Sequence, residues 1–142
     1  MSPGAALLEL AIVIVLAGLL AAIAVPRARA ALDYAAADAA AREITTALAV
    51  ARQSAIRHGV RARLVIGADS LRGELWDGAR WQPGARWPGP AAHGVSVQVS
   101  NPIVTYAPNG VGWGASNTTV TLRRGSQIET ITTSRVGRVR RW

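Results

Sequence analysis

The last residues of the chain carry the arginines best suited to bind an anionic partner. They are Arg138, Arg140 and Arg141, with Arg123 and Arg124 in a separate turn upstream. A guanidinium group donates two parallel hydrogen bonds, which suits phosphate oxygens. In a strand, Arg138 and Arg140 alternate across Val139 and project from one face. One interpretation of this pattern is salt-sensitive binding of a phosphate backbone. The alternative is that these arginines are solvated or contact a neighbouring subunit.

No residue pattern supports catalysis. Ser54 and His58 lie one helical turn apart, but no acidic residue completes a triad with them. His58 and His93 are isolated, and neither has a ligand-type partner at helical or turn spacing. The glycine-rich segment 110–114 lacks the following helix of a phosphate-binding loop and is typical of a β-turn. The sequence therefore predicts a protein that is not an enzyme and has neither cofactor nor metal.

Arginine and tryptophan also alternate in the middle of the chain. The segment Gly-Ala-Arg-Trp at 78–81 is repeated at 84–87, and Trp76 comes just before. Such residues can stack on exposed bases or recruit a partner protein. The pattern favours a hairpin in which tryptophans contact one another across the strands and arginines lie over the indole rings.

Glu9 is the only charged residue in an apolar run from Ala5 to Val25. The run is long enough for a helix that crosses a bilayer core of about 30 Å at about 1.5 Å per residue. A charged side chain near the bilayer centre costs about 2.5–3.5 kcal/mol on insertion scales, so it needs a partner. Cleavage after Gly4 creates a free α-amino group on Ala5. Because the two groups are poorly placed to meet within one helix, we predict that Glu9 pairs with Ala5 of a staggered neighbour.

After Pro26 the sequence stays helical in character to about His58. Alanine is the strongest helix former, and residues 28–55 are rich in it. Apolar residues recur at three- and four-residue steps: Leu32, Ala36, Ala40, Ile44, Leu48, Ala51 and Ala55. The pattern predicts an amphipathic helix, with Gly59 at its C-terminal end.

Beyond Gly59 the sequence changes to short, β-branched runs bounded by Gly, Pro, Asn or Ser. The expected strands cover residues 61–66, 95–99, 103–106, 118–122, 128–133 and 138–141. Asp77-Gly78 predicts a type I′ hairpin turn, while the region 67–94 as a whole resembles a variable loop. The fold class is therefore α+β: a long N-terminal helix, with a transmembrane and an amphipathic half, packed on an antiparallel sheet.

The positive charge of the chain is concentrated in its second half. All sixteen basic residues are arginine, and the net charge is +8. Residues 61–142 hold eleven arginines against four acidic residues, a net charge of +7. A strongly basic domain indicates anionic partners such as nucleic acid, acidic protein surfaces or lipid head groups. Cysteine is absent, so the one small domain that this length allows has no disulfide.

The N-terminus resembles the class III signal of type IV pilins and type II secretion pseudopilins. The resemblance lies in Gly4, the apolar stretch after it, and Glu9 at the fifth position after the glycine. It implies that prepilin peptidase of the inner membrane cuts between Gly4 and Ala5 and methylates the new N-terminus of Ala5. Pro26 falls where this family places a helix kink. Ala5 differs from the usual Phe or Met, and the leader is short and lacks a basic residue.

Two other interpretations of this segment are a secretory signal peptide and a plain membrane anchor. A secretory signal has a basic region before its apolar stretch, and here no basic residue precedes it. The first basic residues, Arg27 and Arg29, follow the run, and the positive-inside rule alone places the C-terminal domain in the cytoplasm. The pilin-like signal implies the reverse orientation.

Three further segments resemble the GspH/FimT family of minor pseudopilins and minor pilins. They are the helix end ITTALAVARQSAIRHGVRARLVI at 44–66, the turn TYAPNGVGWG at 105–114 and the tail ITTSRVGRVRRW at 131–142. The tail also resembles the GRxR motif with which FimT-type minor pilins bind DNA. The resemblance implies a leader (1–4), a transmembrane and filament-core helix (5–25), an amphipathic helix (26–58) and an antiparallel β domain (59–142).

The resemblance also implies a function. We expect a minor pseudopilin of the type II secretion pseudopilus that assembles with other minor and major pseudopilins or pilins and supports protein export across the outer membrane. It is expected in the inner membrane as a single-pass protein, with its N-terminus cytoplasmic and its C-terminal domain periplasmic. The alternative is a type IV pilus minor pilin of the FimT type that binds double-stranded DNA for natural transformation.

Overall fold

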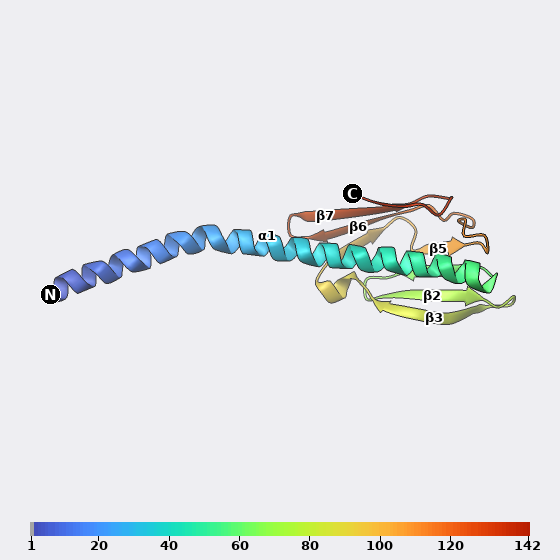
Figure 1. Cartoon of the computed structure of the whole chain (residues 1–142), viewed down its shortest axis with the longest axis horizontal. Coiled ribbons are helices and arrows are strands. Elements are labelled where there is room, and N and C mark those ends of the chain that lie inside the picture. The colour runs from blue at the N-terminus through green and yellow to red at the C-terminus, as the bar shows by residue number, and fades with distance from the viewer. Residues whose placement is uncertain (1) are drawn as a thin grey trace. The chain divides into compact units, whose positions relative to one another are not determined.

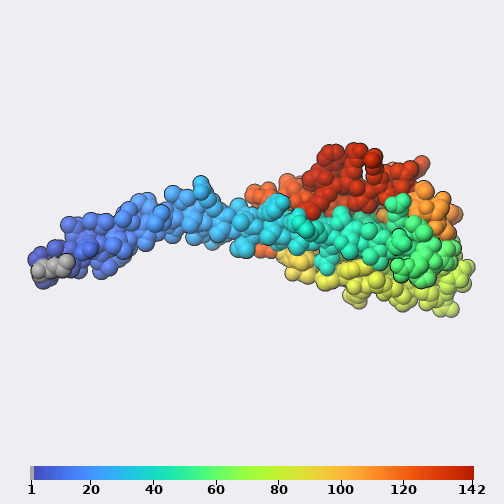
Figure 2. All heavy atoms as spheres, in the orientation of Figure 1, coloured from blue at the N-terminus to red at the C-terminus, as the bar shows by residue number. Residues whose placement is uncertain are grey.

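The computed structural model describes residues 2–142 as two units, one ending at Leu32 and a compact one running from Asp33 to Trp142. A single helix, α1 (Pro3–His58), begins in the first unit and ends in the second. Residues 2–32, blue in Figure 2, are all exposed. This part of α1 is long and apolar enough to cross a membrane. Its apolar side chains therefore need lipid or other helices to cover them. α1 continues through Pro26, and the kink expected there stays a prediction.

The second unit consists of the C-terminal part of α1 and two antiparallel four-stranded sheets (Figure 1). Sheet one has the order β3 (Trp81–Pro88), β2 (Ser70–Trp76), β1 (Ala62–Ile66) and β5 (Ile103–Tyr106). Sheet two has the order β4 (Ser96–Val99), β6 (Thr118–Arg124), β7 (Gln127–Thr133) and β8 (Val139–Arg141). The short 3₁₀ helix η1 (Pro90–His93) precedes β4. The predicted fold class is confirmed, with two sheets in place of one.

One hydrophobic core joins the helix to both sheets. The helix contributes a stripe of small and branched residues: Ala40, Ala41, Ile44, Ala47, Leu48, Ala51 and Ala55. The strands contribute alternate residues, as in β1, where Ala62, Leu64 and Ile66 are buried. Leu32, which the sequence pattern places in this stripe, is instead 64% exposed.

The prediction of a variable loop over residues 67–94 is wrong, because this region forms β2, β3 and η1. β3 lies at the edge of its sheet, contains Pro83 and is almost entirely exposed, so no alternation of apolar residues marks it. Pairing with β2 is irregular between Arg72 and Glu74, so that Gly73 lies opposite two residues of β3. The backbones approach closely there, since a Cβ on Gly84 would lie 3.1 Å from the Gly73 carbonyl oxygen.

The hairpin between β2 and β3 is present, but its turn is not type I′. Trp76 pairs with Trp81, which leaves a four-residue loop. A type I′ turn needs positive φ at both central residues, and of the two predicted residues only Gly78 has it, at 100°. The Asp77 carboxylate instead accepts hydrogen bonds from the backbone N–H groups of Ala79 and Arg80, each at 2.8 Å. These bonds, that from Arg80 foremost, lower the pKa of Asp77.

Candidate functional site

Arg138 and Arg140 project from the outer face of sheet two, as the sequence pattern predicts. β8 pairs with β7 so that Arg140 lies opposite Thr132 and Val139 lies opposite the buried Thr133. Alternation along the strand therefore turns Val139 toward the core and the two arginines toward solvent. Both arginines are exposed.

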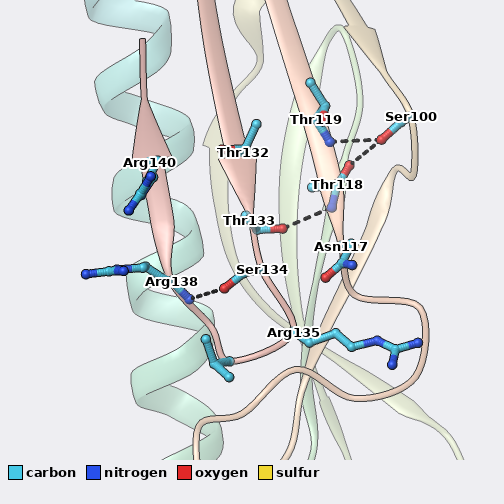
Figure 3. Close-up of a pocket in the computed structure, with 11 residues that line it drawn as sticks. Ser100, Asn117, Thr118, Thr119, Thr132, Thr133, Ser134, Arg135, Arg138 and Arg140 are labelled. Atoms are coloured by element: carbon cyan, nitrogen blue, oxygen red, sulfur yellow. Dashed lines mark hydrogen bonds between the residues drawn. The ribbon is translucent and has the colours of Figure 1, made fainter.

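The arginines border an open hollow of about 660 Å³, the threonine–arginine hollow (Figure 3). It is lined by Ser100, Asn117, Thr118, Thr119, Thr132, Thr133, Ser134, Arg135, Val136, Arg138 and Arg140. Arg138 and Arg140 lie on one side of the threonines in Figure 3, and Arg135 lies on the other. The hydroxyl groups of Thr118 and Thr133 are buried and donate to the carbonyl oxygens of Asn101 and Ser116. The guanidinium groups that border the hollow are therefore its main donors for the oxygens of a phosphate or carboxylate.

Hydrogen bonds hold the lining of the hollow in place. The Thr119 N–H donates to Ser100 Oγ at 2.8 Å, and the Thr118 N–H donates to Thr133 Oγ1 at 3.1 Å. The Arg138 N–H donates to Ser134 Oγ at 3.2 Å, which fixes the turn into β8. A bound anion therefore finds a preformed surface and orders little backbone on binding.

The hollow carries positive charge that no acidic side chain offsets. None of its lining residues is Asp or Glu. Among the described residues, the ion pairs involve neither Arg135, Arg138 nor Arg140. The Cζ of Arg140 lies 5.9 Å from the centroid of the Trp142 ring. Three uncompensated charges on one face attract anions.

The structure does not bring the other predicted arginines into the hollow. Arg123 and Arg124 end β6 and do not occupy a separate turn. Arg123 is exposed but lies four residues along β6 from Thr119, about 13 Å at about 3.3 Å per residue. Arg124 Nε donates to Asp33 Oδ1 at 3.0 Å. Arg135 joins the hollow although sequence reasoning missed it, and its position in the tail segment was the only signal for it.

Arg141 faces the other way and ties the last strand to the helix. Its Nε donates to Glu129 at 3.0 Å, and a second nitrogen bonds Asp38 of α1. These carboxylates raise the pKa of the Arg141 guanidinium. The hydrogen bond from Arg141, followed by that from Arg42, lowers the pKa of Asp38.

These pairs predict an acid-sensitive link between α1 and β8. Folding lowers the pKa of Asp38, so the ionised carboxylate stabilises the folded state at pH values above its unfolded-state pKa of about 3.9. This stabilisation is lost as the pH falls through the lower pKa of the folded state. We expect Arg141→Gln to lower the free energy of unfolding at neutral pH. We also expect a shallower loss of stability below about pH 4. Urea unfolding at several pH values measures both effects, and Arg138→Gln is the matched control. Parallel stability–pH curves for Arg141→Gln and wild type contradict the link.

The three segments that carry the family resemblance meet behind the hollow. Arg52 Nε, near the end of α1, donates to the Gly110 carbonyl at 2.9 Å. The Gly112 N–H donates to the Arg135 carbonyl at 2.7 Å. Gly137 has φ of +74°, and a Cβ there would lie 2.7 Å from the Gly110 oxygen. Glycine at this position therefore allows the turn that carries Arg135 and Arg138 to sit against residues 107–112.

The tryptophans form the cross-strand contact that the sequence favours. The ring centroids of Trp76 and Trp81 are 5.3 Å apart. The arginines over the indole rings come from outside the repeat: the Cζ of Arg63 lies 4.3 Å from the Trp81 centroid, and Arg61 lies over Trp76 at 4.8 Å. Sequence reasoning assigned that place to the arginines within the repeat, because the register of β1 against β2 is not visible in the repeat itself.

Each of the two histidines makes a hydrogen-bond contact with one residue of α1. His58 Nδ1 donates to the Ser54 carbonyl oxygen at 2.9 Å, an ordinary contact within a helix. His93 Nε2 lies 2.9 Å from a Glu43 carboxylate oxygen. Within residues 2–142 no group of three His, Cys, Asp or Glu side chains is arranged to hold a metal.

The predicted processing residues lie in the first turns of α1. A Cβ on Gly4 would have nothing within 4 Å, and Ala5 and Glu9 are exposed. No ion pair among the described residues involves Glu9. Cleavage, methylation and subunit pairing at these positions stay predictions.

The family profile described as type II transport protein GspH matches residues 40–137. Two crystal structures of the type IV minor pilin FimU from Pseudomonas aeruginosa are similar to this chain. The first has a TM-score of 0.61 at 18% identity and covers 72% of this chain and 85% of the FimU chain. The second has a TM-score of 0.60 at 16% identity and covers 74% and 91%. The search of curated proteins gives no match. The likeness to FimU shows a common fold.

Proposed function

The chain belongs to the GspH family of type II transport proteins, and from that membership we propose that it is a minor pseudopilin of a type II secretion pseudopilus. The observation that carries the proposal is the exposed apolar segment of α1 up to residue 32, which is joined to a folded basic domain of this family. A helix of this kind is stable only in lipid or among similar helices. Both environments are available to a subunit that passes from a membrane into a filament.

Each part of the chain then has a role in assembly. The segment from Ala5 to Val25 anchors the precursor in the inner membrane and later joins the helical core of the filament. Glu9 sets the stagger between subunits by pairing with the N-terminal amine of a neighbour. The basic domain lies in the periplasm and contacts other minor pseudopilins, which together initiate the filament for protein export.

Leader removal tests this proposal. We expect Gly4→Leu to abolish cleavage by prepilin peptidase, because the bulky side chain replaces the residue that the peptidase recognises. Mass spectrometry of the membrane-inserted chain measures the loss of residues 1–4 and the methylation of Ala5. Gly18→Leu, in the same helix and also with open space around it, is the control and is expected to be cut normally. Normal cutting of the Gly4 variant refutes the class III signal.

The threonine–arginine hollow favours a second candidate function, DNA binding by a type IV pilus minor pilin. Arg138 and Arg140 extend from one face beside Arg135, with no acid among the lining residues. Such contacts to a phosphate backbone are independent of sequence, and they weaken as the salt concentration rises, because releasing the counterions of DNA then gains less free energy.

Fluorescence anisotropy of labelled double-stranded DNA separates the two functions. If the hollow binds DNA, Arg138→Ala/Arg140→Ala reduces affinity about tenfold or more and lowers the log–log salt slope by about two. Arg72→Ala/Arg86→Ala is the matched control, since these exposed arginines face each other across β2 and β3. Equal losses in the two double variants exclude a dedicated DNA site and leave the secretion pseudopilus.

A further inference from the structure

A guanidinium group contacts two indole rings at one end of sheet one. The Cζ of Arg61 lies 4.8 Å from the centroid of the Trp76 ring and 5.0 Å from that of the Trp113 ring. Arg61 directly precedes β1, Trp76 ends β2, and Trp113 follows β5. Stacking of this kind uses the flat faces of the guanidinium group and leaves the N–H groups at its edge available to an acceptor. We call these three residues the Arg61 clamp.

Backbone pairing, and not the side chains alone, holds the clamp together. The Trp76 N–H donates to the Arg61 carbonyl at 2.9 Å, and the Trp113 N–H donates to the Thr105 carbonyl at 2.8 Å. A further β-bridge joins Tyr106 to Gly112 beside Trp113. The backbone positions of Trp76 and Trp113 beside Arg61 are therefore set by the fold before any ligand arrives, so binding orders little backbone.

The clamp has no acidic partner within the described chain. Arg61 takes part in none of the ion pairs among residues 2–142. The three clamp residues line a second hollow, of about 390 Å³, and Asp77 lines it too. The Asp77 carboxylate oxygens, however, accept hydrogen bonds from the backbone of its own loop and from Gln82 Nε2. Glu74 pairs with Arg63. The guanidinium edge of Arg61 is thus preorganised without a carboxylate from its own domain.

The charge of the domain indicates which partner fits. Residues 33–142 hold fourteen arginines and seven acidic residues. Four of those acids, Asp33, Asp38, Glu74 and Glu129, are in ion pairs with arginines of the domain, and Glu43 is hydrogen-bonded to His93. A second copy of this domain therefore brings a net charge of the same sign and few free carboxylates. Charge complementarity favours a different, acidic protein.

We propose that the Arg61 clamp docks an acidic segment of another protein. An Asp or Glu carboxylate accepts paired hydrogen bonds from Arg61, and the neighbouring residues of that segment pack on Trp76 and on Trp113, which is 52% exposed. Arginine and tryptophan are the residue types that most often dominate interface energies. The identification of the partner as another filament subunit rests on the proposed function. The binding of a carboxylate by Arg61 does not depend on that function.

Binding of a short poly-L-glutamate peptide to the full chain in detergent tests the clamp. Isothermal titration calorimetry at low salt measures the affinity, and poly-L-glutamine is the uncharged control peptide. We expect Arg61→Gln to weaken binding about tenfold or more, and Trp113→Leu to weaken it about fivefold. Arg61→Lys keeps the charge without the planar fork and is expected to weaken binding about threefold. Arg123→Gln removes an exposed arginine of sheet two and should change affinity less than about twofold.

Equal affinities of the Arg61→Gln and Arg123→Gln variants overturn the proposal, because they show a general basic surface. Oligothymidylate is the competing probe. If it binds tightly and loses affinity in Arg61→Gln while poly-L-glutamate does not, the clamp serves nucleic acid and the proposal is wrong. Near-ultraviolet circular dichroism confirms the folding of each variant. If Arg61→Gln does not fold, the affinity of the Arg61→Lys variant tests the proposal in its place. Peptide affinity does not depend on Gly4, so the clamp and the filament function fail separately.

Discussion

Replacing Glu9 with leucine is expected to leave the chain in the membrane and to remove it from filaments. The substitution takes a charge out of an apolar helix, which favours insertion by about 2.5–3.5 kcal/mol if Glu9 lies near the bilayer centre. In the assembled filament the same change leaves the α-amino group on Ala5 of a neighbour without its carboxylate partner in a low-dielectric core. An unpaired buried charge of this kind costs about 3–5 kcal/mol. Incorporation therefore falls by at least about a hundredfold.

Immunoblotting of sheared filaments against the membrane fraction measures this partition. Glu9→Gln keeps the polarity and length of the side chain without its charge, so it is expected to fail as Glu9→Leu does. Leu7→Ala, an exposed neutral change in the same part of α1, is the control and should assemble. Wild-type incorporation of Glu9→Leu refutes the pairing of Glu9 with a neighbouring N-terminus.

Replacing Gly137 with alanine is expected to destabilise the basic domain by about 3–4 kcal/mol, with a loss of at least about 10 °C in Tm. Two effects add at this position. Its φ of +74° lies in the left-handed region, where a residue with a Cβ is strained by about 1–2 kcal/mol. The new Cβ would also lie 2.7 Å from the Gly110 carbonyl oxygen, a backbone atom that has little freedom to move.

Gly114→Ala is the matched control for this prediction. Gly114 has a similar φ of +66° but nothing within 4 Å of the position of a Cβ. It therefore carries the backbone strain alone, and we expect a loss of about 1–2 kcal/mol. Thermal unfolding followed by circular dichroism compares the two. If both variants lose the same stability, the contact between the turn at Gly137 and the Gly110 carbonyl contributes nothing.

The helix and most strands could be predicted because their signals are local. Alanine-rich spacing marks α1, and β-branched runs bounded by turn residues mark β1 and β4 to β8. The edge strand β3 escaped prediction because it is exposed on both faces and contains Pro83, so it lacks the alternation on which strand prediction depends. The type I′ turn predicted at Asp77-Gly78 was wrong because the Asp77 carboxylate accepts hydrogen bonds from the loop backbone. The Asp-Gly pair alone does not specify this loop conformation.

The alternation of Arg138 and Arg140 about Val139 was readable in the sequence, because side-chain direction along a strand has a fixed period of two. The positions and partners of the other arginines could not be read from the sequence. Arg141 of the tail and Arg124 upstream were both predicted to contribute to the same basic patch, yet each is turned toward a carboxylate of α1. Arg135 enters the hollow only because the tail folds back against residues 107–112.

The sequence by itself determined the family, the apolar helix with its lone charge, and the excess of arginine, since each of these depends on composition or on spacing along the chain. Only the tertiary structure decided which arginines are paired. The carboxylates of Asp33, Asp38 and Glu129 reach their partners across distances of up to 103 residues in the chain. It likewise placed Arg61 beside Trp76 and Trp113, because the register of β1 against β2 and the backbone bond from Trp113 to Thr105, and not the order of residues, bring these side chains together.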